Sequence, residues 1–108
     1  MSRVITEPEF ATALRRRLLI TGVKSVTGPG RSGAIASVYA SHMLGLPWIP
    51  YGDPCPQHLR PLLIVDTAMK TGRTMRKAYR RYEDGTAIGI AVFNEPPRVR
   101  FWYEDEGR

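Results

Sequence analysis

Short apolar runs alternate along this chain with segments in which apolar residues recur every three or four positions. The runs, bounded by Gly and Pro, are typical of strands, and the longer spacing is typical of helices with one buried face. The pattern predicts a helix beginning after Thr6, with Phe10, Leu14 and Leu18 on one stripe. Further helices are expected at 33–44 and 74–83, and strands at 23–27, 46–51, 62–65, 86–93 and 99–103, with an antiparallel placement open for the last.

The order of these elements predicts an α/β fold. Strands that alternate with helices of ten or so residues favour right-handed βαβ units and a parallel sheet. The unbroken apolar run Leu62–Val65 is typical of a central strand covered on both faces. We therefore expect one domain over 1–108, with an N-terminal helix in 1–20 and a core in 21–108. The sheet should hold about four or five strands, with helices on both faces.

Charge and composition limit the classes of partner that this chain is expected to bind. The net charge of +6 and the sequence pI of about 10.0 favour a polyanionic partner such as a phosphorylated small molecule. Cys55 is the single cysteine, so neither an internal disulfide nor a cysteine zinc cluster is expected. No apolar run has the length of a signal peptide or a membrane span. We therefore expect a cytoplasmic protein that does not bind a membrane.

The loop 66–74 carries the strongest chemical signal. Asp66 ends the buried strand, and Thr71-Gly72-Arg73-Thr74 opens the next helix. Amide groups at a helix N-terminus are unpaired donors that accept a phosphate readily, and Gly72 lets the backbone approach it. A carboxylate beside them can accept hydrogen bonds from sugar hydroxyls. The pattern thus predicts a sugar-phosphate site, whereas Thr74 alone would indicate only a helix cap.

The segment 64–75 resembles the signature of the type I phosphoribosyltransferase family, in the version found in purine salvage. The likeness covers roughly residues 20–105 in the order of its elements. It implies that Asp66 holds the ribose hydroxyls of phosphoribosyl pyrophosphate, and that the catalytic residues are Asp66 and Lys70. It also implies a transfer of the ribose 5-phosphate group to or from a nitrogenous base.

The same resemblance assigns the remaining roles. The 5-phosphate would be held by Lys70, Thr71, Gly72, Arg73 and Thr74, the pyrophosphate by Gly30, Arg31, Ser32 and Gly33, and the base would stack on Trp102. Magnesium would be the cofactor, bridged through the ligand near Asp66 with no metal site made by the protein alone. The expected partners are phosphoribosyl pyrophosphate or a nucleoside monophosphate, and a second copy of the chain in a homodimer.

Three departures from the family pattern keep a second function open. Thr67 stands at the second acidic position, and Lys70 stands where purine-salvage members usually carry aspartate. The family's long mobile loop corresponds here only to the short, proline-rich segment 52–61. A non-catalytic relative that binds a nucleotide or phosphoribosyl pyrophosphate as a regulator is therefore the alternative.

The turn Gly28–Gly33 supports a further alternative. It matches the glycine spacing of dinucleotide-binding turns, and Asp53 follows 20 residues after Gly33, near the place of a ribose carboxylate. Pro29 stiffens the turn, and this reading leaves 66–74 without a role. We interpret the turn as the pyrophosphate site and keep a dinucleotide-binding module as second alternative. Nucleic acid is not expected as a partner.

Overall fold

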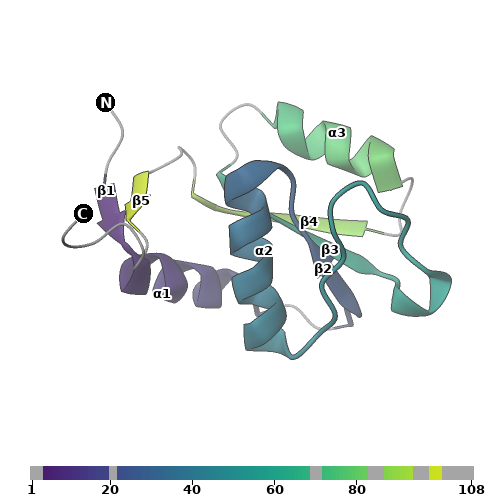
Figure 1. Ribbon diagram of the computed structural model, residues 1–108, viewed down its shortest axis with the longest axis horizontal. Helices are drawn as coiled ribbons and strands as arrows, with labels where there is room; N and C mark the ends of the chain where they lie inside the picture. The colour runs from purple at the N-terminus through teal and green to yellow at the C-terminus, as the bar shows by residue number, and fades with distance from the viewer. Residues whose placement is uncertain (1–3, 20–21, 69–71, 83–86, 94–97, 101–108) are drawn as a thin grey trace.

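A three-stranded parallel sheet forms the centre of the molecule (Figure 1). In the computed structural model, residues 4–19, 22–68, 72–82, 87–93 and 98–100 are described. The strands lie in the order β2 (Ser25–Thr27), β3 (Leu62–Ala68), β4 (Ala87–Phe93). This confirms an α/β arrangement with a parallel sheet.

β3 is the central strand, as its apolar composition predicts. Val26 pairs with Leu63 on one side, and Ile64 pairs with Gly89 on the other. Leu62, Leu63, Ile64 and Val65 are all buried, because both faces of the strand are covered. The strand continues past the expected end at 65, so Asp66 lies within it.

The segment expected as a strand at 46–51 contributes a single bridge, between Trp48 and Val26. The Val26 amide donates to the Pro47 carbonyl at 2.9 Å, and the Ile49 amide donates to the Val26 carbonyl at 2.8 Å. Prolines in this segment lack the amide hydrogen that longer pairing needs. The sheet therefore has three strands and this bridging segment, fewer than the four or five strands expected.

Within the described residues, three α-helices flank the sheet: α1 (Glu7–Arg17), α2 (Gly30–Leu44) and α3 (Arg73–Tyr82). α1 begins with a capping box, in which Thr6 and Glu9 each accept the other's backbone amide hydrogen. α2 begins three residues earlier than the sequence pattern predicts, so part of the glycine turn is its first turn.

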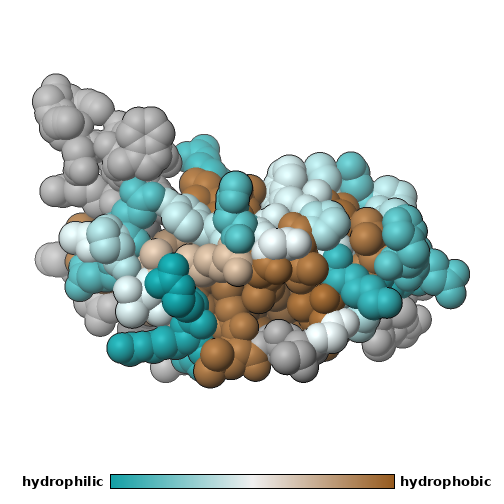
Figure 2. All heavy atoms as spheres, turned by 90° about the horizontal axis from the view of Figure 1, so that it is seen from below, coloured by the Kyte–Doolittle hydropathy of each residue, from teal (hydrophilic) through white to brown (hydrophobic). Residues whose placement is uncertain are grey.

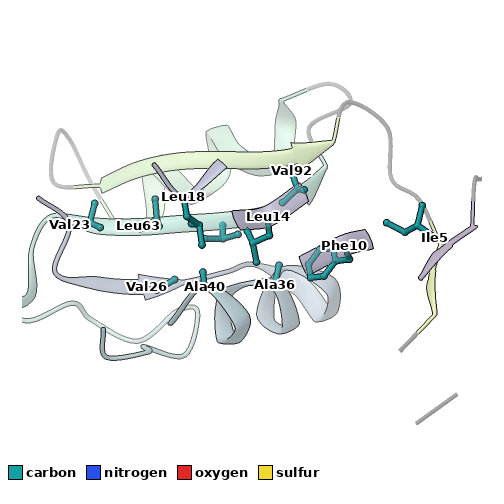
Figure 3. Close-up of a cluster of buried hydrophobic side chains, with 11 residues drawn as sticks. Ile5, Phe10, Leu14, Leu18, Val23, Val26, Ala36, Ala40, Leu63 and Val92 are labelled. Atoms are coloured by element: carbon teal, nitrogen blue, oxygen red, sulfur yellow. The ribbon is translucent and has the colours of Figure 1, made fainter. Parts of the chain in front are cut away.

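Two apolar clusters place the helices on opposite faces of the sheet. The larger joins α1, α2 and one face of the strands, and Figure 3 shows Phe10 and Leu14 meeting side chains of α2 and the sheet. The smaller joins α3 to the other face through Met75, Ala78 and Ile64. A short 3-10 helix, η1 (Gln57–Leu59), lies in the segment that leads into β3.

A second sheet pairs β1 (Val4–Thr6) with β5 (Arg98–Arg100). The sequence pattern did not predict β1, and it placed the last strand at 99–103. The pair is parallel, with Ile5 opposite Val99, so the antiparallel placement left open for the last strand is wrong.

Apolar atoms also reach the surface. Seen from below, they gather in the middle of the face, with hydrophilic side chains around them (Figure 2). Large exposed apolar side chains among the described residues include Leu19, Val38, Trp48 and Tyr79. No helix in the described part of the chain is long and apolar enough to cross a membrane.

Candidate functional site

Asp66 lies near the carboxyl end of β3, half-buried. Its Oδ1 accepts a hydrogen bond from the Thr67 amide at 2.8 Å. Burial raises the pKa of the Asp66 carboxyl, and this amide opposes the rise by stabilising the charged form. The side chain is thus a desolvated acceptor, which suits it to bind sugar hydroxyls.

Thr67 occupies the position of the family's second acidic residue and lies on the opposite face of β3. Successive side chains of a strand point to opposite faces, so Asp66 shares its face with Ile64, whereas Thr67 shares its face with Val65. Thr67 is only 5% exposed. A carboxylate at this buried position would be desolvated on the face opposite Asp66.

The first turn of α3 carries the described part of the predicted phosphate site. Gly72 has φ +79, and its carbonyl accepts the Arg76 amide at 2.9 Å, so helical hydrogen bonding begins there. Arg73 and Thr74 are exposed, and the turn contains no acidic residue. Lys70 and Thr71, which the resemblance adds to this site, lie outside the described residues.

Arg76, which the sequence analysis did not name, lies over Gly72 at the start of α3. A Cβ added to Gly72 would lie 3.0 Å from Arg76 Nη1, so the guanidinium covers the glycine. Helical side chains lean toward the N-terminus, which brings a residue over the one four positions earlier. The four-residue spacing of Gly72 and Arg76 in the sequence could therefore have predicted this contact.

The glycine turn lies directly against the middle of β3. A Cβ on Gly28 would lie 2.6 Å from the Val65 carbonyl oxygen, and Gly33 is buried against Pro29 and the same carbonyl. Gly28 and Gly33 are therefore required by packing. Gly30, Arg31 and Ser32 are exposed in the first turn of α2, where the backbone amides have no partner within the helix. Because β2 and β3 are parallel neighbours, the glycine turn and Asp66 lie toward the same end of the sheet.

The segment 52–61 does not have the character of a closing loop. The Gly52 amide donates to the Tyr82 hydroxyl at 2.7 Å, and Arg81 donates to the Gly52 carbonyl. Cys55 is buried, and the Leu59 carbonyl accepts the Ser25 hydroxyl at 2.7 Å. Tyr82 ends α3, about 14 Å along the helix from Arg73. The segment is therefore anchored to the last turn of α3 and does not lie over the first turn of that helix.

The other expected site residues are placed as follows. Asp53, which the dinucleotide alternative requires, is exposed beside the anchored Gly52. Trp102, the expected stacking residue, lies outside the described residues. Among the residues that the structure describes, no three His, Cys, Asp or Glu side chains form a group able to hold a metal ion.

Solved structures share this architecture. A xanthine-guanine-hypoxanthine phosphoribosyltransferase from Helicobacter pylori superposes with a TM-score of 0.71 at 13% identity, over 96% of this chain and 93% of its own. A purine phosphoribosyltransferase from Pyrococcus horikoshii gives 0.65 at 16%, over 99% and 96%. The chain has the phosphoribosyltransferase fold. A hypothetical protein from Neisseria gonorrhoeae with bound ppGpp gives 0.62 at 15%, over 97% and 91%.

Comparisons at the level of sequence add no closer relative. No family model matches the chain. No curated protein matches it either. At 13–16% identity the structural likeness shows the phosphoribosyltransferase fold and not the activity.

Proposed function

We propose that this chain binds phosphoribosyl pyrophosphate at the carboxyl ends of β2 and β3 and transfers its ribose 5-phosphate group to a nitrogenous base. The observation that carries the proposal is the packing of the glycine turn against β3 at the residue before Asp66. Gly28 packs against the carbonyl of Val65, the residue before Asp66, so the glycine turn and the signature loop share one edge of the sheet. Ligands of open α/β sheets bind at such an edge.

The 5-phosphate fits the first turn of α3. A dianion there is stabilised by the unpaired amides and by the helix dipole, and no acidic residue of the turn opposes it. Gly72 leaves the backbone open to close approach, and Arg73, Thr74 and Arg76 supply further donors. By the family resemblance, Lys70 and Thr71 complete this loop.

The pyrophosphate fits the first turn of α2. Gly30, Arg31 and Ser32 are exposed there, with an arginine able to donate two hydrogen bonds to phosphate oxygens. Magnesium would arrive with the ligand, because this ion usually binds one or two carboxylates together with phosphate oxygens. Asp66 is the side chain suited to face it, and the ion would offset the charge of the phosphate groups.

The reaction would be a substitution at C1 of the ribose. A ring nitrogen of the base forms a bond to C1 while the bond from C1 to the pyrophosphate oxygen breaks, and the pyrophosphate leaves with the electron pair. The base nitrogen then loses its proton to the departing pyrophosphate or to solvent. Positive charge develops on the ribose ring during this step, and the Asp66 carboxylate would hold the ring hydroxyls and stabilise that charge. The resemblance gives Lys70 a catalytic role and Trp102 the stacking of the base.

Calorimetric titration with phosphoribosyl pyrophosphate and magnesium tests the binding. We expect Asp66→Asn to bind roughly tenfold to hundredfold more weakly than wild type, since a hydrogen bond to a charged group is worth about 1.5–3 kcal/mol. Asp53→Asn, which changes an exposed carboxylate outside the site, is the matched control and should bind as wild type. Absence of heat with wild type would defeat the proposal. Release of pyrophosphate with a panel of bases then tests the transfer.

A non-catalytic regulator is the second candidate, favoured by two observations. The segment 52–61 is anchored away from the first turn of α3, and one structure of the same fold was solved with ppGpp bound. Such a regulator would bind ppGpp or phosphoribosyl pyrophosphate at the same edge of the sheet. Competition between the two ligands in calorimetry, with no pyrophosphate released for any base, would support this candidate over the transferase.

A further inference from the structure

α3 carries a concentration of positive charge that no acidic residue of the helix balances. Five of its ten residues are Arg or Lys, and none is Asp or Glu. Its buried side chains, Met75, Ala78 and Tyr82, belong to the cluster that packs on the sheet. Figure 1 shows the helix on the upper side of the sheet, with no described element above it. The face of α3 opposite the buried side chains is therefore open to solvent.

Helical geometry puts four of these charges in one line. With 3.6 residues per turn, the positions centred opposite the buried face are those of Arg73, Arg76, Lys77 and Arg80. All four side chains are exposed. The line runs about 10 Å along the helix, so positive charge repeats at each turn. We call these four residues the basic stripe.

The basic stripe lowers the stability of the helix that carries it. Like charges three or four residues apart repel each other on a helix, and the stripe contains two pairs at each spacing. Basic residues near the start of a helix also oppose its dipole. α1 provides the comparison, because its arginines 15–17 lie in the last turn, where the dipole favours them, and its first turn contains Glu7 and Glu9. The charge of α1 thus supports its helix, whereas the charge of α3 indicates an external anion.

A phosphate backbone is the anion that matches the stripe best. Three of the four residues are arginine, whose planar guanidinium group can donate two hydrogen bonds to one phosphate. A membrane surface does not fit, because a helix on a membrane needs an apolar face for the lipid, and the apolar face of α3 is buried against the sheet. A protein surface is less suited, since protein interfaces centre on apolar and aromatic side chains and the stripe has none.

Tyr79 adds a feature that favours a single strand over a duplex. It flanks the stripe and is 40% exposed. Its hydroxyl accepts the Gly89 amide at 2.8 Å, which ties the ring to β4. Proteins that bind single-stranded nucleic acid combine basic side chains along the backbone with aromatic rings on which the bases stack. The stripe and the ring together have this combination.

We propose that the basic stripe and Tyr79 form a binding surface for single-stranded nucleic acid. The stripe binds the phosphate backbone, and the ring of Tyr79 stacks on a base. Nucleic acid was not expected from the sequence, which does not show that these basic side chains lie in one line. Arg73 and Arg76 also belong to the proposed phosphate site, whereas Lys77, Arg80 and Tyr79 have no part in it. The inference goes beyond the proposed function and does not depend on it.

Fluorescence anisotropy with a labelled oligouridine of about 12 nucleotides tests this surface. At moderate salt we expect Lys77→Gln/Arg80→Gln to bind roughly tenfold more weakly than wild type. Contacts with four phosphates give a slope of about −3 in a plot of log affinity against log salt, and the double variant should reduce its magnitude by about 1.4. Arg15→Gln/Arg16→Gln, which removes the same charge from the last turn of α1, is the matched control and should bind as wild type.

Two variants of Tyr79 separate the ring from the hydroxyl. Tyr79→Phe and Tyr79→Ala both lose the hydrogen bond to Gly89 and should melt below wild type, but only the alanine variant should bind the oligonucleotide roughly tenfold to hundredfold more weakly. Equal binding by the two variants would overturn the role of the ring. Absence of binding by wild type, or an equal loss in the α1 and α3 double variants, would overturn the whole inference.

Calorimetry with phosphoribosyl pyrophosphate and magnesium keeps this inference separate from the proposed function. Lys77→Gln/Arg80→Gln should bind that ligand as wild type does, because neither residue belongs to the phosphate site. A wild-type protein that binds the oligonucleotide but not phosphoribosyl pyrophosphate would overturn the proposed function and leave the surface on α3 standing. The reverse result would overturn the surface alone.

Discussion

Substitution of Gly28 by alanine tests the packing that joins the two loops. The φ of Gly28 is not positive, so this position requires glycine because there is no room for a side chain. A Cβ there would lie 2.6 Å from the Val65 carbonyl oxygen and closer still to the Gly33 carbonyl oxygen, whereas ordinary contact begins at 3.4 Å. Both neighbours are backbone atoms and cannot rotate away. The turn and β3 must therefore separate by about 0.8 Å or more, which loosens the packing around them.

The expected cost is at the upper end of the range for overpacked sites, about 3 kcal/mol of unfolding free energy. For a domain of this size that lowers the melting temperature by about 10–20 °C. Gly22→Ala is the control, because a Cβ on Gly22 meets nothing within 4 Å and its φ of +90 is the only source of strain. That strain is worth about 1–2 kcal/mol. Thermal unfolding by circular dichroism measures both.

Ligand binding by the two glycine variants completes the test. Gly28→Ala should lose affinity for phosphoribosyl pyrophosphate even at temperatures where it is folded, because the pyrophosphate turn has moved relative to β3. Gly22→Ala should bind as wild type. A Gly28→Ala protein that melts no lower than Gly22→Ala and binds the ligand equally well would refute the reasoning, and with it the close packing of the glycine turn against β3.

Three further predictions follow from the site. Binding of phosphoribosyl pyrophosphate should weaken as the pH falls through the raised pKa of Asp66, because the carboxylate is then protonated, and this loss should begin at a higher pH than for an ordinary aspartate with a pKa near 4. The affinity of Asp66→Asn, measured between about pH 4 and pH 7, should lack this pH dependence. Tyr82→Phe removes the acceptor of the Gly52 amide and should lower stability by about 1 kcal/mol in urea unfolding, with unchanged affinity; a weaker affinity would contradict the location given to the segment 52–61. Arg76→Gln should weaken phosphate binding about tenfold in calorimetry, whereas Arg80→Gln, later on the same helix, should not; equal effects would indicate only a general loss of positive charge.

Local patterns predicted most of the central fold. The apolar run at Leu62–Val65 identified the central strand, because a strand covered on both faces has no polar positions to interrupt it. The pattern also placed the start of the first helix after Thr6, where the structure has the capping box of α1. These features depend on neighbours within a few residues, which is the information a single sequence carries directly.

Features that depend on distant partners were missed or misplaced. β1 is three residues long, and its pairing with β5 is decided by chain more than 90 residues away. The strand expected at 46–51 is reduced to one bridge, because prolines remove the donors that longer pairing requires.

At the candidate site, the signature loop and the glycine turn were recognisable from their spacing, and the structure brings the described parts of both to one edge of the sheet. The placement of Arg76 over Gly72 follows from helical geometry and was within reach of the sequence. The structure also shows that the buried hydroxyl of Thr27 in β2 has no hydrogen-bond partner, which the sequence could not predict because only the assembled sheet shows which buried donors lack an acceptor.

The parallel pair of β1 and β5 makes one end of the described chain depend on the other. Val4–Thr6 and Arg98–Arg100 hold each other across nearly the whole length of the polypeptide, and closing so long a stretch is slow, so this contact should form late in folding. Any change that unpairs one of these strands also leaves the backbone N–H and C=O groups of the other strand without their partners. A truncation or fusion designed at residues 4–6 should therefore be assessed by its effect on the pairing of residues 98–100, near the other end of the sequence.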